Sequence, residues 1–451
     1  MLSLLISLLG IFLTIFLVVG VHEYGHFITA RLCGIKVQRF SIGFGKALFR
    51  WHDKKGTEYV IAPIPLGGYV KMVDENEENV AKEDLPFAFN RQPLYKRMAV
   101  IVAGPITNII FAGFLYWLIF MVGFTTFKPI IGSITPLSIA ALAGLKTQEE
   151  VIQIDHDPTI SWYTATIKIL ERAGDTGYMQ FQTQALKSNQ THSYSLNLAS
   201  WHLDELKPDP LASLGIEPFY PTIPTLIAAI QKNSPAEKTL LQPGDKILAI
   251  NKKNIHDWSD LSTTVALSPE KTLLFTVSRQ NKTIDVPVQI GYHRDLFFKK
   301  HGYLGLIPKF TMPPDLLRHE QYGPIGALVQ SGTEVKNFTE LNFILLGKII
   351  QGKVSLKSLG GPITIFETAG TALNNGFIPF ASFLAFLSIS IGIVNILPIP
   401  GLDGGHFLFQ VIELIIRRPI PERVQNLFLK LGLIFLLVLI TQAIVNDILR
   451  L

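Results

Sequence analysis

The stretch VVGVHEYGHFITAR, residues 18–31, holds the side chains best suited to chemistry in this chain. His22 and His26 are four residues apart, so on a helix they share a face and can present two imidazoles to one metal ion. Glu23 lies beside the first histidine, close enough to activate a water molecule but spaced wrongly to be a third ligand. This is the HExxH arrangement of zinc peptidases, and it predicts Zn²⁺ bound by both histidines with Glu23 as the catalytic base.

The surroundings of this motif favour a functional reading. Composition alone would produce an HExxH in roughly one chain in a hundred of this length. Here, however, the motif lies in an apolar run that begins at Leu4, and ionisable residues at membrane depth are costly unless they are used. Zinc needs a third protein ligand and an open position for water. Asp403, in NILPIPGLDGGHFLF, is an isolated acid beside another apolar segment, and we expect it to be that ligand rather than part of a surface turn.

Composition narrows the classes of protein. The chain has 451 residues, 48% of them hydrophobic, which indicates several membrane spans together with soluble domains. Its net charge of +5 is spread along the chain without a basic block, so no nucleic-acid partner is expected. The single cysteine, Cys33, excludes an intrachain disulfide and a CxxC metal site. The N-terminal run lacks a basic n-region and an A-x-A site, and we interpret it as a retained helix.

Four apolar segments are long enough to cross a bilayer: 4–30, 98–124, 378–399 and 427–445. Residues 31–97 contain twelve Lys or Arg, and three arginines precede the last segment, so both loops are expected on the cytoplasmic side. Both termini then lie outside. In the second segment, Gly104 is expected to permit close packing against the first helix. Asn108 either packs between helices or contacts a polar site.

Residues 40–72 are predicted to form strands joined by a polar turn at 52–56. The segment is too apolar for a free cytoplasmic loop. Two readings stay open: a β-loop associated with the membrane, its backbone covered by protein, or an ordinary surface hairpin.

An internal repeat lies between the second and third spans. Two segments 96 residues apart, ending at Trp162 and Trp258, each combine a helical turn, a loop, an alternating strand and a polar turn. The second, with SPAEKTLLQPGDKI, resembles a PDZ domain, a type that binds extended peptides at a sheet edge. We therefore expect two PDZ-like α/β domains, 125–220 and 221–310, outside the membrane. They would be followed by an amphipathic helix and then irregular chain over 311–375, with transmembrane halves at 1–124 and 376–451.

HEYGH, the PDZ-like pair and NILPIPGLDGG together resemble the site-2 protease family of intramembrane zinc metalloproteases, and within it the bacterial regulator-of-sigma-E type. The resemblance implies His22, His26 and Asp403 as zinc ligands and Glu23 as the base. It implies that Asn395 helps to hold substrate, and that Gly67, Gly68 and Tyr69 belong to a membrane-associated β-loop that receives the substrate strand. It also implies a bacterial inner-membrane location, with the PDZ-like domains and both termini periplasmic and the domains filtering access of substrates.

The expected function is therefore zinc-dependent cleavage within or beside the transmembrane segment of a single-span protein, an anti-sigma factor by the resemblance, in regulated intramembrane proteolysis during stress. The bilayer is the other expected partner, with periplasmic peptides as candidates for the PDZ-like domains. Two rival classes remain open. A non-catalytic PDZ scaffold would tolerate Glu23→Gln, and a metal transporter would repeat polar residues along a path, whereas this chain concentrates them at one depth.

Overall fold

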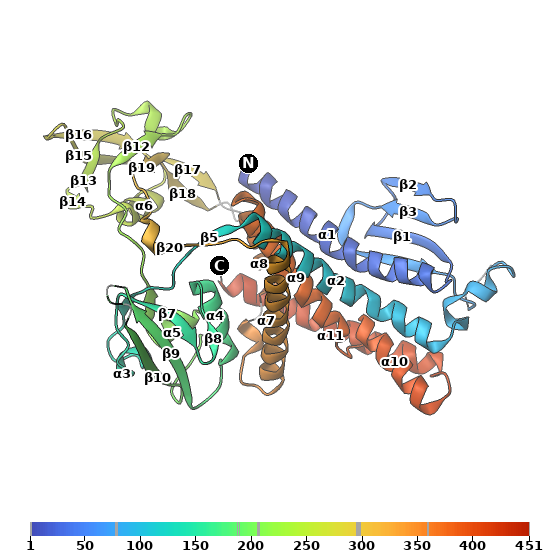
Figure 1. Cartoon of the computed structure of the whole chain (residues 1–451). Helices are drawn as coiled ribbons and strands as arrows, with labels where there is room; N and C mark the ends of the chain where they lie inside the picture. The colour runs from blue at the N-terminus through green and yellow to red at the C-terminus, as the bar shows by residue number, and fades with distance from the viewer. Residues whose placement is uncertain are drawn as a thin grey trace. The chain divides into compact units, whose positions relative to one another are not determined.

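The computed structural model describes residues 2–76, 80–186, 188, 190–204, 208–294, 299–358 and 360–450 (Figure 1). The chain divides into two compact units. The first contains Met1–Pro129, Ile134–Glu217 and His319–Leu451, and the second contains Ile130–Ser133 and Pro218–Arg318.

Four helices of the first unit are long and apolar enough to cross a membrane among the described residues: α1 (Leu2–Leu32), α2 (Leu94–Val122), α9 (Phe377–Ile396) and α11 (Glu422–Arg450). The four predicted segments are therefore helices with the length and hydropathy to span a membrane, and their boundaries shift by a few residues. Helices suit such segments because every backbone polar group inside lipid must be satisfied within the segment itself. Helix α2 packs against both α1 and α9, and small residues such as the fully buried Ala112 and Ala385 let these helices approach closely.

A four-stranded sheet lies beside α1 and fills the expected β-loop: β1 (Val37–Phe44), β2 (Phe49–His52), β3 (Glu58–Ile61) and β4 (Ile64–Met72). The strand order is β2-β3-β1-β4, with β1 parallel to β3 and antiparallel to β4. Two 3₁₀ turns, Leu85–Phe87 and Phe89–Arg91, connect the sheet to α2. Strands β1 and β4 both contact α1, and β4 is an edge strand of this sheet.

The sequence repeat corresponds to a repeated fold. In the first unit, β7 (Glu149–Ile154), β8 (Asp157–Pro158), α4 (Trp162–Glu171), β9 (Tyr178–Ala185) and β10 (Thr191–Asn197) form a sheet of order β10-β9-β7-β8. In the second unit, β13 (Lys246–Ile250), β14 (Lys253–Asn254), α6 (Trp258–Ala266), β15 (Thr272–Arg279) and β16 (Lys282–Gln289) repeat it as β16-β15-β13-β14. Even the irregularity in the central strand recurs 96 residues later, between Val151 and Gln153 and again between Ile247 and Ala249.

One buried carboxylate also recurs. Asp245 is fully buried and accepts two hydrogen bonds of 2.7 Å from Arg279, one from Nε and one from Nη2. Burial would raise the pKa of Asp245, but the guanidinium and the backbone N–H of Gln242 hold it below its ordinary value. In the first copy Glu149 takes this place, 96 residues earlier, and His192 lies 2.8 Å from its Oε1. The Thr-Gln-Glu of the first copy therefore replaces Pro-Gly-Asp without loss of the internal carboxylate.

The remaining elements around the repeats are short. In the first unit they are α3 (Ile139–Leu142) and α5 (Pro210–Leu214). In the second unit β12 (Ile227–Ile230) pairs with β19 (Leu306–Pro308), β17 (Gly291–Arg294) pairs with β18 (Lys300–Tyr303), and a 3₁₀ turn spans Pro235–Lys238. The connecting segments contain β5 (Phe124–Phe127), β6 (Ile131–Ile134), β11 (Ile216–Pro218), a 3₁₀ turn at Pro314–Leu316 and β20 (Leu317–Glu320).

Residues after the repeats correct one expectation. Helix α7 (Pro324–Ile350) is the predicted amphipathic helix, but the chain after it is not irregular: a turn at Leu356–Ser358 leads into a further helix, α8 (Pro362–Asn374). Pro362 is the first residue of this helix. The carboxylate of Asp447, in α11, accepts hydrogen bonds from the backbone N–H groups of Gly361, Ile363 and Thr364, and so caps α8 from a distant part of the chain. Between α9 and α11 the chain forms one more helix, α10 (Asp403–Ile416).

Candidate metal centre

The two histidines of the motif meet on α1. His22 and His26 are both buried, and their Nε2 atoms lie 3.2 Å apart. The i, i+4 spacing on a continuous helix produces this approach, as the sequence predicts.

Asp403 completes a triangle with them. Its Oδ2 lies 3.0 Å from Nε2 of His22 and 3.3 Å from Nε2 of His26. Despite these distances, this buried oxygen does not meet the angles of a hydrogen bond to any described residue. Zinc bonds of about 2.0–2.1 Å at tetrahedral angles place ligand atoms about 3.3 Å apart. Three donor atoms of the types that zinc prefers thus stand at about the spacing of three corners of its coordination tetrahedron.

The break between α9 and α10 directs Asp403 towards the histidines. Helix α9 ends at Ile396, before two prolines, and Asp403 is the first residue of α10. At Gly404 a Cβ atom would overlap the carbonyl oxygens of Ile396 and Leu397, so only glycine lets the two helix ends lie this close.

An ion pair holds the other end of α10 against α2. The guanidinium of Arg97 binds Glu413 through two hydrogen bonds, of 2.6 and 3.2 Å. Because both side chains are largely buried, this fork-to-fork contact fixes α10 relative to α2.

Helix α2 also determines which ring nitrogen of His26 carries the proton. Nδ1 of His26 lies 2.7 Å from the carbonyl oxygen of Val100. A carbonyl can only accept, so Nδ1 carries the proton, and in a neutral imidazole Nε2 is then a free lone pair directed into the triangle.

Asn108, fully buried on α2, faces the other imidazole. Its amide lies 3.3 Å from Nδ1 of His22, through Nδ2, while its Oδ1 is buried without a hydrogen-bond partner among the described residues. Turning the amide by 180° exchanges its two ends, gives Oδ1 the Nδ1 proton and leaves Nε2 free for a metal. Of the two readings left open for Asn108, the contact with a polar site is the one observed.

Gly104 lies between these two contacts on the same helix. A Cβ atom there would overlap Nε2 of His26 and come within 2.9 Å of Cε1 of His22. Gly104 does permit close packing of α2 against α1, as expected. The place where the two helices approach is the position of the histidine donor atoms.

The predicted base lies against one of the three predicted β-loop residues, Gly68. A Cβ atom at Gly68, in β4, would be 2.7 Å from Cγ of Glu23. Gly67 and Tyr69 alternate with Gly68 along the strand and face the other way: Tyr69 accepts a 3.2 Å hydrogen bond from Arg39. The structure therefore brings Gly68 to the catalytic motif and directs the Tyr69 side chain elsewhere.

Asn395, the remaining predicted site residue, is half-buried near the end of α9. It shares with Asp403 the wall of a hollow of about 120 Å³ between α2, α9 and α10. Sequence reasoning missed the Val100 carbonyl and the Arg97–Glu413 pair. A backbone acceptor has no signature in the sequence, and the two charges are 316 residues apart.

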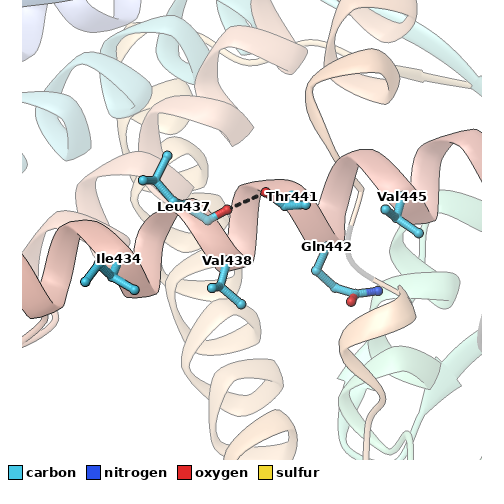
Figure 2. Close-up of a pocket in the computed structure, with 6 residues that line it drawn as sticks. All are labelled: Ile434, Leu437, Val438, Thr441, Gln442 and Val445. Atoms are coloured by element: carbon cyan, nitrogen blue, oxygen red, sulfur yellow. Dashed lines mark hydrogen bonds between the residues drawn. The ribbon is translucent and has the colours of Figure 1, made fainter.

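A larger hollow, of about 340 Å³, lies along α11 and contains none of the predicted site residues (Figure 2). Its lining comes from α11 alone: Ile434, Leu437, Val438, Thr441, Gln442 and Val445. None of these side chains is ionisable, and the hydroxyl of Thr441 is already donated to the Leu437 carbonyl at 2.8 Å. This surface has no group that could act on a peptide bond.

Comparison with known proteins agrees with the geometry. The profile of Peptidase family M50 matches residues 10–439. The chain is 40% identical over 452 residues to "Regulator of sigma E protease" of Salmonella typhimurium and 39% identical over 452 residues to "Regulator of sigma-E protease RseP" of Escherichia coli, covering 100% of both chains in each case. It is 38% identical over 437 residues to "Putative zinc metalloprotease" of Vibrio cholerae, covering 96% of each.

Proposed function

The chain belongs to Peptidase family M50 and is a zinc metalloprotease, and from that premise we propose that it cleaves within or beside the transmembrane segment of a single-span membrane protein. The substrate class we propose is an anti-sigma factor, because the relatives are named as regulators of sigma E. Cleavage would release the sigma factor in a stress response.

The observation that supports this most directly is the triangle of donor atoms with edges of 3.0, 3.2 and 3.3 Å. His22, His26 and Asp403 would hold the zinc ion. Bound zinc would lower the pKa of a water ligand and polarise the scissile carbonyl. Catalytic zinc sites use three protein ligands and keep one position for water or substrate, and these three residues would leave that position open.

Glu23 is proposed as the proton carrier. It follows a ligand directly in sequence, and its side chain lies against Gly68 of the edge strand β4, so we propose that its carboxylate acts between the donor atoms and this strand. From there it takes a proton from the attacking water and passes it to the departing amine, acting first as base and then as acid.

Strand β4 would hold the substrate extended. A transmembrane helix hides its carbonyls in its own hydrogen bonds, so it must unwind before attack, and an edge strand offers the free backbone groups that stabilise an unwound segment. We propose that the backbone around Gly67, Gly68 and Tyr69 pairs with it and that Asn395 contacts it near Asp403. The exposed Leu48, Phe49 and Trp51 of this sheet favour the membrane-associated reading of the β-loop.

The remaining features suit a bacterial inner-membrane enzyme. The basic loops at 31–97 and 417–423 would face the cytoplasm, which puts both termini and residues 125–375 in the periplasm. The two repeated modules are proposed as PDZ-like domains, 125–220 and 221–310, that limit access to the core. Their shared strand order and repeated irregularity support a common fold for the pair.

The test is cleavage of a purified anti-sigma factor by the full-length chain reconstituted in liposomes. The parent should cut the substrate, lose activity when zinc is chelated and recover it when zinc is restored. Glu23→Gln should bind zinc as the parent does yet fail to cut, because only proton transfer is removed. Equal cleavage by Glu23→Gln would contradict the proposal, and so would a parent that is active without zinc.

A further inference from the structure

We propose that the hollow beside Asp403 is a subsite that receives one aliphatic side chain of the substrate next to the scissile bond. This inference rests on the proposed function and specifies which residues that function accepts. The hollow has a volume of about 120 Å³.

Three helices, α2, α9 and α10, build this hollow. Ile101, Val102 and Pro105 come from α2, Ile396 from α9 and Phe407 from α10. Asp403 forms part of the same wall, and its Oδ2 lies 3.0 Å from Nε2 of His22. When the scissile carbonyl of a peptide lies at these donor atoms, the side chains of the two residues that flank the scissile bond lie within a few ångströms of the same donor atoms. A hollow that shares a wall with a donor carboxylate is therefore placed for one of those two side chains.

The size of the hollow selects among side chains. An apolar cavity of about 150 Å³ holds a benzene molecule. A space of about 120 Å³ accordingly takes Ala, Val or Leu and crowds Phe or Trp. A smaller side chain leaves part of it empty and forfeits contacts, so Gly should bind less well than Leu.

The chemistry of the wall selects further. Apart from Asp403 and Asn395, the wall consists of aliphatic and aromatic side chains with Gly404. A buried charge without a partner is strongly disfavoured, and zinc would occupy the Asp403 carboxylate, so Asp and Lys should be refused. Lipid is a weaker candidate occupant, because an acyl chain is several times longer than a hollow that holds a single side chain.

The test is the sequence preference of cleavage by the full-length chain in detergent micelles. The substrate is a synthetic peptide library between lysine flanks, an apolar segment in which a few central positions carry every amino acid, and mass spectrometry identifies the residues on both sides of each cut. The parent should disfavour Phe, Trp, Asp and Lys about ten-fold or more at one flanking position, the discrimination expected of a shaped apolar pocket.

Variants of two walls should change that one position. Ile101→Ala and Phe407→Leu, which enlarge the hollow from different helices, should raise the share of products with Phe there, while Ile101→Phe should shift the preference to Ala. Ile110→Ala is the matched control: it makes the same change on the same helix, at a residue that is 64% exposed and outside the hollow. It should keep the preference of the parent.

Two failures would be distinguishable. If the parent cuts in a manner that depends on Glu23 and zinc, yet the Ile101 and Phe407 variants keep its preference at both flanking positions, the subsite is overturned and the proposed function stands. If Glu23→Gln cuts the library as the parent does, the proposed function fails and the subsite fails with it.

Discussion

Replacing Asn108 by Leu should weaken zinc binding without touching a ligand. Leu has the same branching as Asn but removes the amide that lies 3.3 Å from Nδ1 of His22, a buried imidazole. An unsatisfied buried N–H costs about 1–3 kcal/mol. At 1.4 kcal/mol per factor of ten, the zinc dissociation constant should rise about 5- to 150-fold, in line with the 10- to 100-fold expected for an outer-shell partner.

The assay is competition for zinc between the purified full-length chain and a chelator of known affinity, which reads binding apart from activity. Ser388→Ala is the matched control, because Ser388 is equally buried and donates a 2.9 Å hydrogen bond to the backbone carbonyl of Asn108, not to its amide. It should bind zinc as the parent does.

Asn108→Asp separates the two orientations of the amide. A carboxylate only accepts, so it can take the Nδ1 proton of His22 and should preserve zinc affinity. Parent-like affinity in Asn108→Leu, or weaker binding in Asn108→Asp than in Asn108→Leu, would refute the reasoning.

Three further predictions follow from the contacts. Arg97→Gln should lower the temperature of unfolding in detergent. The exchanged pair, Arg97→Glu with Glu413→Arg, should be more stable than the sum of the two single variants predicts, by a coupling free energy of about 1–3 kcal/mol in a double-mutant cycle. Additive effects of the two substitutions would contradict a specific ion pair. Gly104→Ala places a methyl group on Nε2 of His26, so zinc measured by elemental analysis should fall below that of the parent; full occupancy would show that the helices can separate. Asp245 has a lowered pKa when folded, so its stabilisation is present above the unfolded pKa and is lost as the pH falls through the folded value. Between pH 6 and pH 3, Asp245→Asn should therefore flatten the increase in protease sensitivity of residues 218–318; an unchanged profile would contradict this.

The parts of the fold that sequence predicts are those that local spacing determines. Two histidines four residues apart on a helix must share a face, whatever surrounds them. A module copied 96 residues downstream keeps its strands, its buried carboxylate and its strand irregularity because each copy encodes them locally. Apolar length gives the four spans for the same reason.

The parts that sequence does not reveal depend on partners far along the chain. Gly-Pro at 361–362 resembles a helix terminator, yet Pro362 starts α8 because Asp447, 86 residues away from Gly361, supplies the missing cap. Asn108 could not be decided for a similar reason, since its partner His22 is also 86 residues distant. The parallel pairing of β1 with β3 accompanies a contact between Tyr59 of β3 and Phe27 of α1, whose ring centroids lie 5.7 Å apart, and no strand pattern encodes this contact.

One helix relates the two halves of the metal centre. Arg97, Val100, Gly104 and Asn108 follow one another at intervals of three, four and four residues, which is one face of α2. This face binds α10 at one end, orients both imidazoles and leaves room for the donor atoms. The neighbouring face, with Ile101 and Pro105, lines the hollow beside Asp403. Substitutions on the first face should therefore change zinc affinity and not residue preference, while Ile101→Ala should change preference and not zinc affinity. Variants in which both quantities always move together would show that the two faces do not act separately.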